Sequence, residues 1–145
     1  MNQHTETDIA WVALGTNVGH RAAALQRLRD ALTVDGVRIE RRSAEILTRP
    51  VGPTAQEDFH NQLVVLRSPA PWLPHRWLQH CKQAEVAAGR RETYRWGPRV
   101  ADADIILLGE DGDITVEEPD LQVPHPGLLS RAYLWRLMEE LRPER

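Results

Sequence analysis

The chain has 145 residues, of which 41 % are hydrophobic and 27 % charged, and its 18 basic and 21 acidic side chains give a formal net charge of −3. This length fits a single compact domain over residues 1–145, and the acidic balance argues against non-specific nucleic-acid binding, which needs an excess of Lys and Arg. The sequence has no apolar run of the roughly 20 residues that a membrane span requires, no secretory signal, and only one cysteine, Cys81, which excludes a disulfide framework. We therefore expect a soluble protein of the cytoplasm.

The first half of the sequence predicts one helix followed and preceded by strands. The apolar run 9–14 predicts a buried strand, and a helix with Asn17 as its cap follows it. The strand-like residues 37–47 and the β-branched run 63–66 predict the next two strands. The helix is indicated by leucines at helical spacing, Leu25, Leu28 and Leu32.

The second half predicts a helix, a strand, a hairpin and a final helix. The proline-rich residues 68–74 resemble a connection into a helix that ends at Gly89. The run 105–108 predicts a fourth strand, and the Asp-Gly pair at 111–112 is a hairpin-turn signal that leads into residues 114–116. The helices have apolar stripes, Trp77, Cys81, Ala84 and Ala88 in the first and Leu134, Leu137, Met138 and Leu141 in the second.

The order β-α-β-β-α-β, with a short added hairpin and a C-terminal helix, predicts an α+β fold with a ferredoxin-like antiparallel sheet. Helices on one face of such a sheet would leave the other face free for a ligand. A small doubly wound sheet is the alternative, which we rank lower.

A basic segment of the sequence runs directly into an acidic one. Residues 82–99 have five basic side chains against two acidic ones, and residues 100–120 have eight acidic side chains and no basic one. Phosphate oxygens bind Arg and hard cations bind carboxylates, so the pattern suits a site for a polyphosphate with its divalent cations. Surface salt bridges between the two segments would explain the same pattern.

Two acidic residues in this region have the spacing of neighbours on one strand face. Asp102 and Asp104 would point to the same side with α-carbons about 6.5 to 7 Å apart, while Ala101, Ala103 and Ile105 would pack against a helix. A bound dication would relieve the repulsion between the carboxylates, and oxygen ligands favour Mg²⁺ over Zn²⁺. An exposed strand end with two solvated acids is the alternative for so short a motif.

A single histidine lies in a rigid loop before the last helix. His125 stands between two prolines, and its imidazole N–H could donate to a phosphate, although a lone histidine is more often structural. The chain has no Walker-type phosphate loop, so a nucleotide would have to be bound by arginine, histidine and aspartate side chains.

Residues 89–105 contain the string Arg-Trp-Gly-Pro-Arg-Val-Ala-Asp-Ala-Asp-Ile. This string resembles the R-W-G-P-R-x-x-D-x-D-I motif of the hydroxymethyldihydropterin pyrophosphokinase family, which are enzymes of folate biosynthesis. Further blocks agree in the same order. Residues 13–17 resemble the family's G-S-N opening with Thr for Ser, residues 48–61 resemble its pterin loop, and Glu85 and residues 124–131 complete the set.

The resemblance implies a ferredoxin-like fold and a reaction in which the terminal two phosphates of ATP move to the hydroxymethyl group of 6-hydroxymethyl-7,8-dihydropterin, releasing AMP. The implied partners are therefore two small molecules, ATP and the pterin, with neither nucleic acid nor a membrane. Association with other enzymes of the folate pathway is a further expectation.

Roles at the phosphate end follow by position from the same resemblance. Asp102 and Asp104 would be ligands of two Mg²⁺ ions, and Arg90 and Arg99 would share with them the catalytic role. The residues implied in ATP binding are Glu85, Arg90, Trp96, Arg99, Ile105, His125 and Arg131.

Roles at the pterin end follow in the same way. Phe59 and Tyr133 match the family's two stacking aromatics, and Asn61 matches the residue that reads the amide edge of the pterin. Phe59 could instead be a core residue at the end of its strand, whereas a buried Asn61 needs a polar partner. The residues implied in pterin binding are Thr48, Val51, Gly52, Phe59, Asn61 and Tyr133.

The sequence departs from the family pattern beside the acidic pair. Ala101 and Ala103 stand where leucines are common, which reduces the packing volume under the predicted metal site. A family member that acts on a different hydroxymethyl heterocycle is one alternative function. A non-catalytic ferredoxin-like binding module is another, and the retention of Asp102 and Asp104 argues against it.

Overall fold

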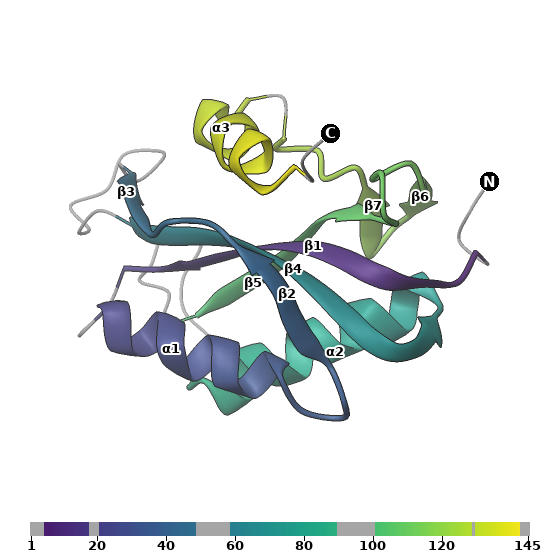
Figure 1. The fold of residues 1–145 in the computed structure, drawn as a ribbon, viewed down its shortest axis with the longest axis horizontal. Helices are drawn as coiled ribbons and strands as arrows, with labels where there is room; N and C mark the ends of the chain where they lie inside the picture. The colour runs from purple at the N-terminus through teal and green to yellow at the C-terminus, as the bar shows by residue number, and fades with distance from the viewer. Residues whose placement is uncertain (1–4, 18–20, 49–58, 90–100, 129, 143–145) are drawn as a thin grey trace.

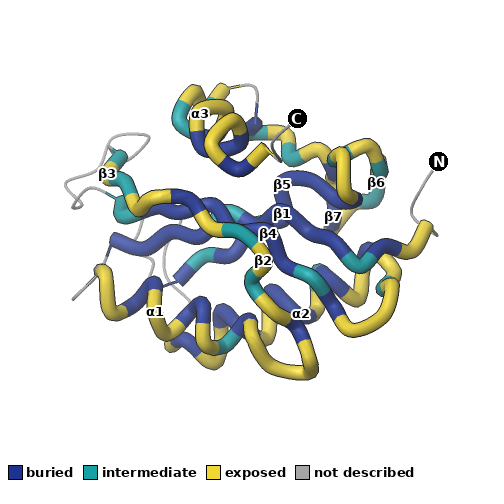
Figure 2. Tube along the Cα trace, viewed as in Figure 1, coloured by how far each residue is buried: buried dark blue, intermediate teal, exposed yellow. Residues whose placement is uncertain are grey.

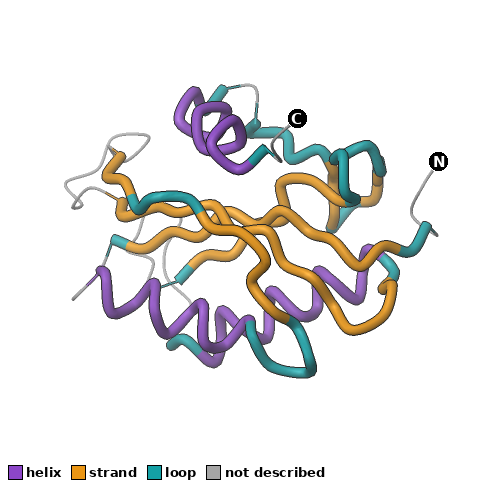
Figure 3. Tube along the Cα trace, in the orientation of Figure 1, coloured by secondary structure: helices purple, strands orange, loops and turns teal. Residues whose placement is uncertain are grey.

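The structure of the protein, a computed structural model, describes residues 5–17, 21–48, 59–89, 101–128 and 130–142. These residues form seven strands and three helices (Figure 1 and Figure 3). The strands are β1 (Thr7–Thr16), β2 (Arg38–Arg42), β3 (Ile46–Thr48), β4 (Phe59–Trp72), β5 (Asp102–Leu108), β6 (Val116–Glu118) and β7 (Leu121–Val123). The helices are α1 (Arg21–Leu32), α2 (Pro74–Ala87) and α3 (Ala132–Leu141).

The main sheet has the strand order β2-β4-β1-β5, and each strand is antiparallel to its neighbour. The short β3 pairs with β4 beyond the end of β2, on the same edge. This order, with α1 and α2 as crossover helices, confirms the ferredoxin-like fold predicted from the sequence. The antiparallel pairing excludes the doubly wound alternative, and α3 is the expected C-terminal helix. The added hairpin is formed by β6 and β7.

The sheet separates two apolar layers (Figure 1 and Figure 2). Helices α1 and α2 cover one face over a core cluster that includes Leu28 and Trp77. Helix α3 packs on the other face over a second cluster that includes Trp11, Val65 and Leu137. The face that the sequence analysis expected to be left free for a ligand is therefore covered in part by the apolar stripe of α3.

The helical stripes predicted from the sequence are confirmed. Helix α2 begins at Pro74, where a missing N–H leaves no hydrogen bond unmade, and ends before Gly89, whose φ is +101°. The expected cap of α1, Asn17, is followed by residues outside the described part. Buried stripe residues are Leu25, Leu28 and Leu32 in α1, Trp77, Cys81, Ala84 and Ala88 at α2, and Leu134, Leu137, Met138 and Leu141 in α3.

The strand predicted over residues 37–47 is divided into β2 and β3 by residues 43–45. Ser43 N–H donates to the Leu63 carbonyl at 2.9 Å, and Ser43 Oγ accepts from Leu63 N–H at 2.9 Å. Gln62 Nε2 donates to the Ser43 carbonyl at 2.8 Å. These contacts come from β4, so the sequence of the edge segment alone gives no sign of the break.

The proline-rich residues 68–71 extend β4 and do not form the connection that the sequence predicts. In the β1–β4 ladder Ile9 pairs with Arg67 and Thr7 pairs with Trp72, so four residues of β4 stand opposite one residue of β1. A bulge of this kind needs no ladder N–H from proline, which explains why the strand tolerates it.

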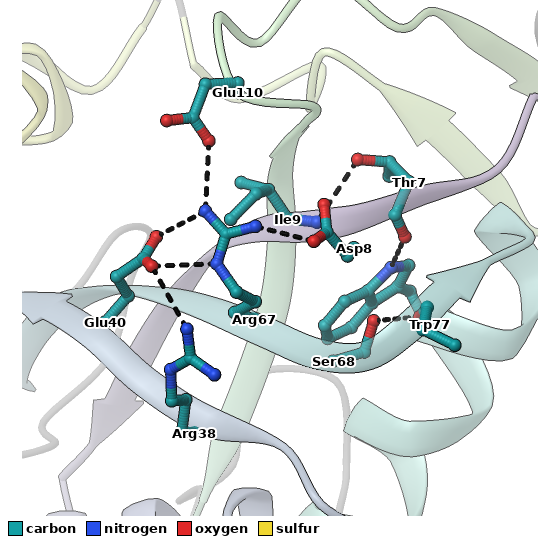
Figure 4. Close-up of polar contacts among 10 residues, drawn as sticks. Thr7, Asp8, Ile9, Arg38, Glu40, Arg67, Ser68, Trp77 and Glu110 are labelled. Atoms are coloured by element: carbon teal, nitrogen blue, oxygen red, sulfur yellow. Dashed lines mark hydrogen bonds and ion pairs between the residues drawn. The ribbon is translucent and has the colours of Figure 1, made fainter.

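An arginine-centred network anchors this end of the sheet (Figure 4). Arg67 Nη1 donates to Asp8 Oδ2 at 2.6 Å, and Arg67 Nε donates to Glu40 Oε1 at 2.8 Å. Its Nη2 lies 3.5 Å from Glu110 Oε2. The hydrogen bonds from Arg67 hold the pKa of Glu40 below its usual range. The network ties β1, β2 and the turn after β5 together.

The turn at residues 111–112 forms as predicted, but the hairpin does not follow from it. Gly112 N–H donates to the Gly109 carbonyl at 3.1 Å, and Gly112 has a φ of +68°. After this turn a single bridge joins Leu108 to Ile114. Residue 116 then begins β6, which pairs with β7 and not with β5.

No helix among the described residues is long and apolar enough to cross a membrane. Cys81 is fully buried in α2, and this burial raises the pKa of its thiol.

Candidate active site

The first residues of β5 alternate between the two faces of the sheet. Ala101, Ala103 and Ile105 are at most 5 % exposed and belong to the core cluster under α1 and α2. The half-buried Asp102 and Asp104 therefore lie on the opposite face, toward α3. The shared face predicted for the two acids is confirmed, and the two small alanines belong to a closed core layer.

Asp102 lies in one row with residues of the two neighbouring strands. It pairs with Gly15 in β1, and Gly15 pairs on its other side with Asn61 in β4. Paired residues have side chains on the same face, and neighbouring strands are about 4.8 Å apart. The α-carbons of Asp102 and Asn61 are therefore about 10 Å apart, with a residue that has no side chain between them.

Gly15 leaves room for two side chains of β4. A Cβ atom at Gly15 would lie 3.2 Å from Asn61 Oδ1 and 3.9 Å from Phe59 Cδ1. The amide oxygen and the aromatic ring edge therefore lie next to the glycine on the face that also carries Asp102. Phe59 is half-buried and belongs to neither core cluster, so it is not the core residue that the alternative assumed.

Hydrogen bonds fix the orientation of the Asn61 amide. Its Nδ2 donates to Thr48 Oγ1 at 2.6 Å and to the Phe59 carbonyl at 3.2 Å. The NH₂ group thus faces β3, and Oδ1 faces Gly15. Asn61 is 7 % exposed, and these contacts supply the polar partner that the sequence analysis required.

The loop before α3 orients His125 at the end of β5. His125 N–H donates to the Ile106 carbonyl at 3.0 Å, and Gly127 N–H donates to His125 Nδ1 at 2.9 Å. The neutral imidazole therefore carries its proton on Nε2, where it can donate. A Cβ at Gly127 would lie 3.2 Å from Arg131 Nε, so this glycine allows the guanidinium to lie beside the imidazole.

Four side chains of this region influence one another electrostatically. Burial lowers the pKa of His125 below its usual 6.5; the charge of Arg131 adds to this effect and that of Asp104 opposes it. Burial also raises the pKa of Tyr133, while the charge and hydrogen bond of Arg131 oppose the rise. The structure thus brings Asp104, His125, Arg131 and Tyr133 near one another on the α3 side of the sheet.

Two residues predicted to bind ATP lie on the other side of β5. Glu85 in α2 is 2 % exposed, and its Oε2 accepts from Ala103 N–H at 2.8 Å. Its Oε1 lies 3.8 Å from Lys82 Nζ. The Ile105 side chain is buried in the core, so its main chain is the part left for a nucleotide. Contact of both residues with ATP stays a prediction.

The remaining predicted site residues lie outside the described part of the chain. They are Val51 and Gly52 for the pterin, and Arg90, Trp96 and Arg99 for ATP.

The donor set on β5 suits a hard divalent cation, of which Mg²⁺ is one. Within the described ranges, no group of three or more His, Cys, Asp or Glu side chains could hold a metal. Asp102 and Asp104 thus offer two carboxylates, and Mg²⁺ commonly binds through one or two carboxylates together with water and substrate phosphates. A structural zinc site would need four protein ligands.

Sequence reasoning missed several polar residues near β3 and in the loop before α3. Beside β3, Glu45 pairs with both Arg29 and His60. In the loop before α3, Gly127 makes room for the Arg131 guanidinium. A signal for Arg29 exists in the sequence, because it follows Leu25 by four residues and so falls on the buried stripe of α1. Glu45 and His60 give no comparable signal, since their pairing depends on the fold.

The structure defines a ferredoxin-like α+β protein. One face of its sheet carries the carboxylates of Asp102 and Asp104 together with the Phe59 ring and the Asn61 amide. The sequence model of the family described as 7,8-dihydro-6-hydroxymethylpterin-pyrophosphokinase matches residues 11–143. The chain belongs to this family.

Several curated relatives share the name 2-amino-4-hydroxy-6-hydroxymethyldihydropteridine pyrophosphokinase. The one from Methylorubrum extorquens is 35 % identical over 93 % of this chain and 83 % of its own length. The one from Bacillus subtilis is 34 % identical over 92 % of this chain and 78 % of its own. The one from Pseudomonas aeruginosa is 31 % identical, with 92 % and 80 % covered.

Proposed function

We propose that this protein transfers pyrophosphate from ATP to the hydroxymethyl group of 6-hydroxymethyl-7,8-dihydropterin and releases AMP, as a step of folate biosynthesis. One observation carries the proposal. In a chain of this family, Asp102 and Asn61 lie on the same sheet face, on either side of Gly15. This arrangement would let a flat heterocycle at Asn61 present its hydroxymethyl group toward phosphates held at the acidic pair.

The pterin would bind at the β3–β4 end of the face. Asn61 Oδ1 would accept from the pterin's N–H groups, and Phe59 and Tyr133 would stack on the ring. Thr48 would act mainly through its hydrogen bond with Asn61. Val51 and Gly52 would add contacts from the loop between β3 and β4.

The nucleotide would bind at the β5 end. Arg131 and the Nε2–H of His125 would donate to phosphate oxygens, and Arg90 and Arg99 would add two further cations. Glu85, Trp96 and the main chain of Ile105 would complete the ATP site. In this arrangement the predicted phosphate ligands would surround the triphosphate from β5, from the loop before α3 and from the 90–100 segment.

Asp102 and Asp104 would hold Mg²⁺, and two ions are implied by the family resemblance. Bound there, Mg²⁺ would neutralise the triphosphate charge and orient it. The carboxylates themselves would keep this charge at a fixed distance from Asn61, because both lie on rigid strands of one sheet.

The transfer requires no covalent enzyme intermediate. The hydroxymethyl oxygen would form a bond to the β-phosphorus and release its proton to water, while the bond from that phosphorus to the oxygen bridging the α-phosphate breaks. AMP leaves with the electron pair. The protein would accelerate this step through positioning and fixed charge, which agrees with a site built from Asp, Arg, His and Asn.

The test is to incubate the protein with ATP, Mg²⁺ and hydroxymethyldihydropterin and to separate AMP from ADP. We expect pterin-dependent AMP formation that EDTA abolishes and Mg²⁺ restores. Absence of AMP with every divalent cation would reject the proposal, whereas AMP only with another hydroxymethyl heterocycle would indicate a different acceptor. The cytoplasmic location and the association with other folate enzymes are further proposals, which cell fractionation and co-purification would test.

A further inference from the structure

A buried cation lies behind the pterin end of the site. Arg29 in α1 is 6 % exposed, and its guanidinium lies at the helix-covered face of the sheet. Its Nη1 donates to Gln62 Oε1 at 2.6 Å and to Glu45 Oε2 at 3.1 Å, and its Nη2 donates to Gln26 Oε1 at 2.8 Å. Burying a guanidinium is costly unless it is paired, so Arg29 strongly favours a carboxylate at this place.

Glu45 contacts a second partner with its other oxygen. His60 Nε2 lies 2.9 Å from Glu45 Oε1, so the carboxylate joins α1 to β4. Glu45 itself belongs to the 43–45 segment that separates β2 from β3. Just before β3, one carboxylate oxygen of Glu45 thus contacts α1 and the other contacts β4.

The strand that follows is positioned by its ladder with β4 and by Ile46, which packs against the second core cluster. β3 has three residues on the edge of the sheet, and its middle residue, Leu47, is 59 % exposed. Its ladder with β4 pairs Ile46 with Asn61 and Thr48 with Phe59. Beyond Ile46 the short edge strand buries little apolar surface, so the attachment before its first residue matters for where its last residue lies.

The last residue of β3, together with the Phe59 carbonyl, orients the Asn61 amide that is proposed to read the pterin. Thr48 Oγ1 accepts the 2.6 Å hydrogen bond from Asn61 Nδ2. A shift of β3 by a fraction of an ångström would lengthen this bond and allow the Asn61 amide to turn. Glu45 is therefore connected to Asn61 through the three residues of β3 and the hydrogen bond from Asn61 to Thr48.

The segment before β3 is also attached to the opposite layer. Ala44 N–H donates to Glu140 Oε2 in α3 at 2.8 Å, and Arg41 donates to the Leu141 carbonyl. Residues 43–45 are thus held from both sides of the sheet, which makes them a fixed base from which β3 extends.

We propose that Glu45 is a positioning residue for pterin binding. Its pairing with Arg29 and His60 holds β3 in register, and β3 in turn presents Thr48 to Asn61. The inference rests on the proposed function for its kinetic readout, but its structural readout, the protection of β3, does not depend on that function.

The variant Glu45→Gln removes the charge and keeps the side-chain size. A matched control is Glu40→Gln, which removes a carboxylate on β2 whose oxygens accept from Arg67 at 2.8 and 3.0 Å, at the other end of the same edge. We expect Glu45→Gln to raise the KM for the pterin five- to tenfold while the KM for ATP and kcat change less than twofold. Glu40→Gln should leave all three within twofold.

A double variant tests the route through Thr48. In a Thr48→Val background, which removes the hydroxyl that accepts from Asn61, Glu45→Gln should change the pterin KM less than twofold further. An equal five- to tenfold increase in both backgrounds would overturn the proposal, because the two residues would then act independently. So would a rise in the KM for ATP that matches the rise for the pterin.

Hydrogen exchange gives the readout that does not need activity. We expect faster amide exchange in residues 46–48 of Glu45→Gln than in wild type, with no change there in Glu40→Gln. Unchanged exchange in β3 would overturn the proposal even if kinetics changed. If the wild-type protein formed no AMP, only the proposed function would be rejected. The exchange comparison would still show whether Glu45 holds β3 in place.

Discussion

The two faces of the sheet are built from the same strands but differ in how far apolar packing extends. Under α1 and α2, buried side chains cross the strands without interruption, as Leu66, Val12 and Ile105 show with exposures of 4 % or less. Toward α3, the fully buried residues of the apolar cluster end before the row that contains Asn61 and Asp102, where the half-buried Ile46 packs against the cluster from the edge of the sheet. Strand alternation thus lets one set of residues stabilise the fold and another provide polar groups for binding.

This difference predicts that substitutions on the two faces will have different effects, on stability for one face and on activity for the other. A change of an apolar core side chain under α1 and α2 should lower stability and leave the turnover of each folded molecule intact. A change in the polar row should lower turnover or substrate affinity and leave stability nearly intact. The following variants test this separation, from the largest expected effect to the smallest.

Asp104→Ala should have the largest effect. Loss of one of two metal-binding carboxylates should reduce turnover at least about a thousandfold, or ~4 kcal/mol of transition-state stabilisation. Stability should not fall, because the variant removes repulsion between neighbouring carboxylates. Steady-state AMP formation and thermal denaturation measure the two quantities.

The control for this variant is Asp111→Ala, which removes an exposed acid of the same acidic segment. It should keep wild-type turnover. Turnover of Asp104→Ala within tenfold of wild type would show that the acidic pair on β5 is not the metal site.

Leu66→Ala tests the opposite face. Leu66 is fully buried under the helices, and the cavity left by this change should lower the free energy of unfolding by about 2–5 kcal/mol. Urea denaturation measures this loss, and kcat per folded molecule should stay unchanged. Val86→Ala, at a position that is 70 % exposed, should cost less than about 0.5 kcal/mol. A large drop in kcat for Leu66→Ala would contradict the separation of the two faces.

Gly15→Ala tests the gap within the polar row. The new Cβ would lie 3.2 Å from Asn61 Oδ1, so the amide must move by a few tenths of an ångström. We expect the KM for the pterin to rise about tenfold, equivalent to ~1.4 kcal/mol, with the KM for ATP unchanged. An unchanged pterin KM would mean that Asn61 Oδ1 does not hydrogen-bond to the pterin from its present position.

The smallest effect concerns the titration of His125, followed by NMR of its imidazole. Its pKa should lie below 6.5 because the ring is partly buried and Arg131 is near. The folded protein then binds fewer protons than the unfolded chain near pH 6, so stability should fall as the pH drops through this range. Arg131→Gln should raise the pKa of His125, and Asp104→Asn should lower it. A shift of either in the other direction would contradict the arrangement described.

Local sequence patterns predicted the parts of the molecule that depend on alternation and helical spacing. Asp102 and Asp104 could be assigned to one strand face because a period of two leaves no other choice once Ala101 and Ala103 are buried. The same holds for the leucines of α1 and for the strand order, which follows from the sequence of elements.

Features that depend on distant side chains could not be predicted in this way. The break at residues 43–45 arises from hydrogen bonds with Gln62 and Leu63. The continuation of β4 through its prolines depends on a bulge in the ladder with β1. The burial of Glu85 against the Ala103 amide likewise needs the packing of α2 on β5.

The burial of Cys81 has a practical consequence for work on this protein. It is the sole cysteine of the chain and lies in α2 with no exposed surface, and its surroundings disfavour the thiolate that alkylating reagents attack. Labelling at this sulfur therefore reports how often α2 opens far enough to expose its buried face. The rate of thiol labelling at Cys81 can thus be used to measure this opening without introducing a cysteine.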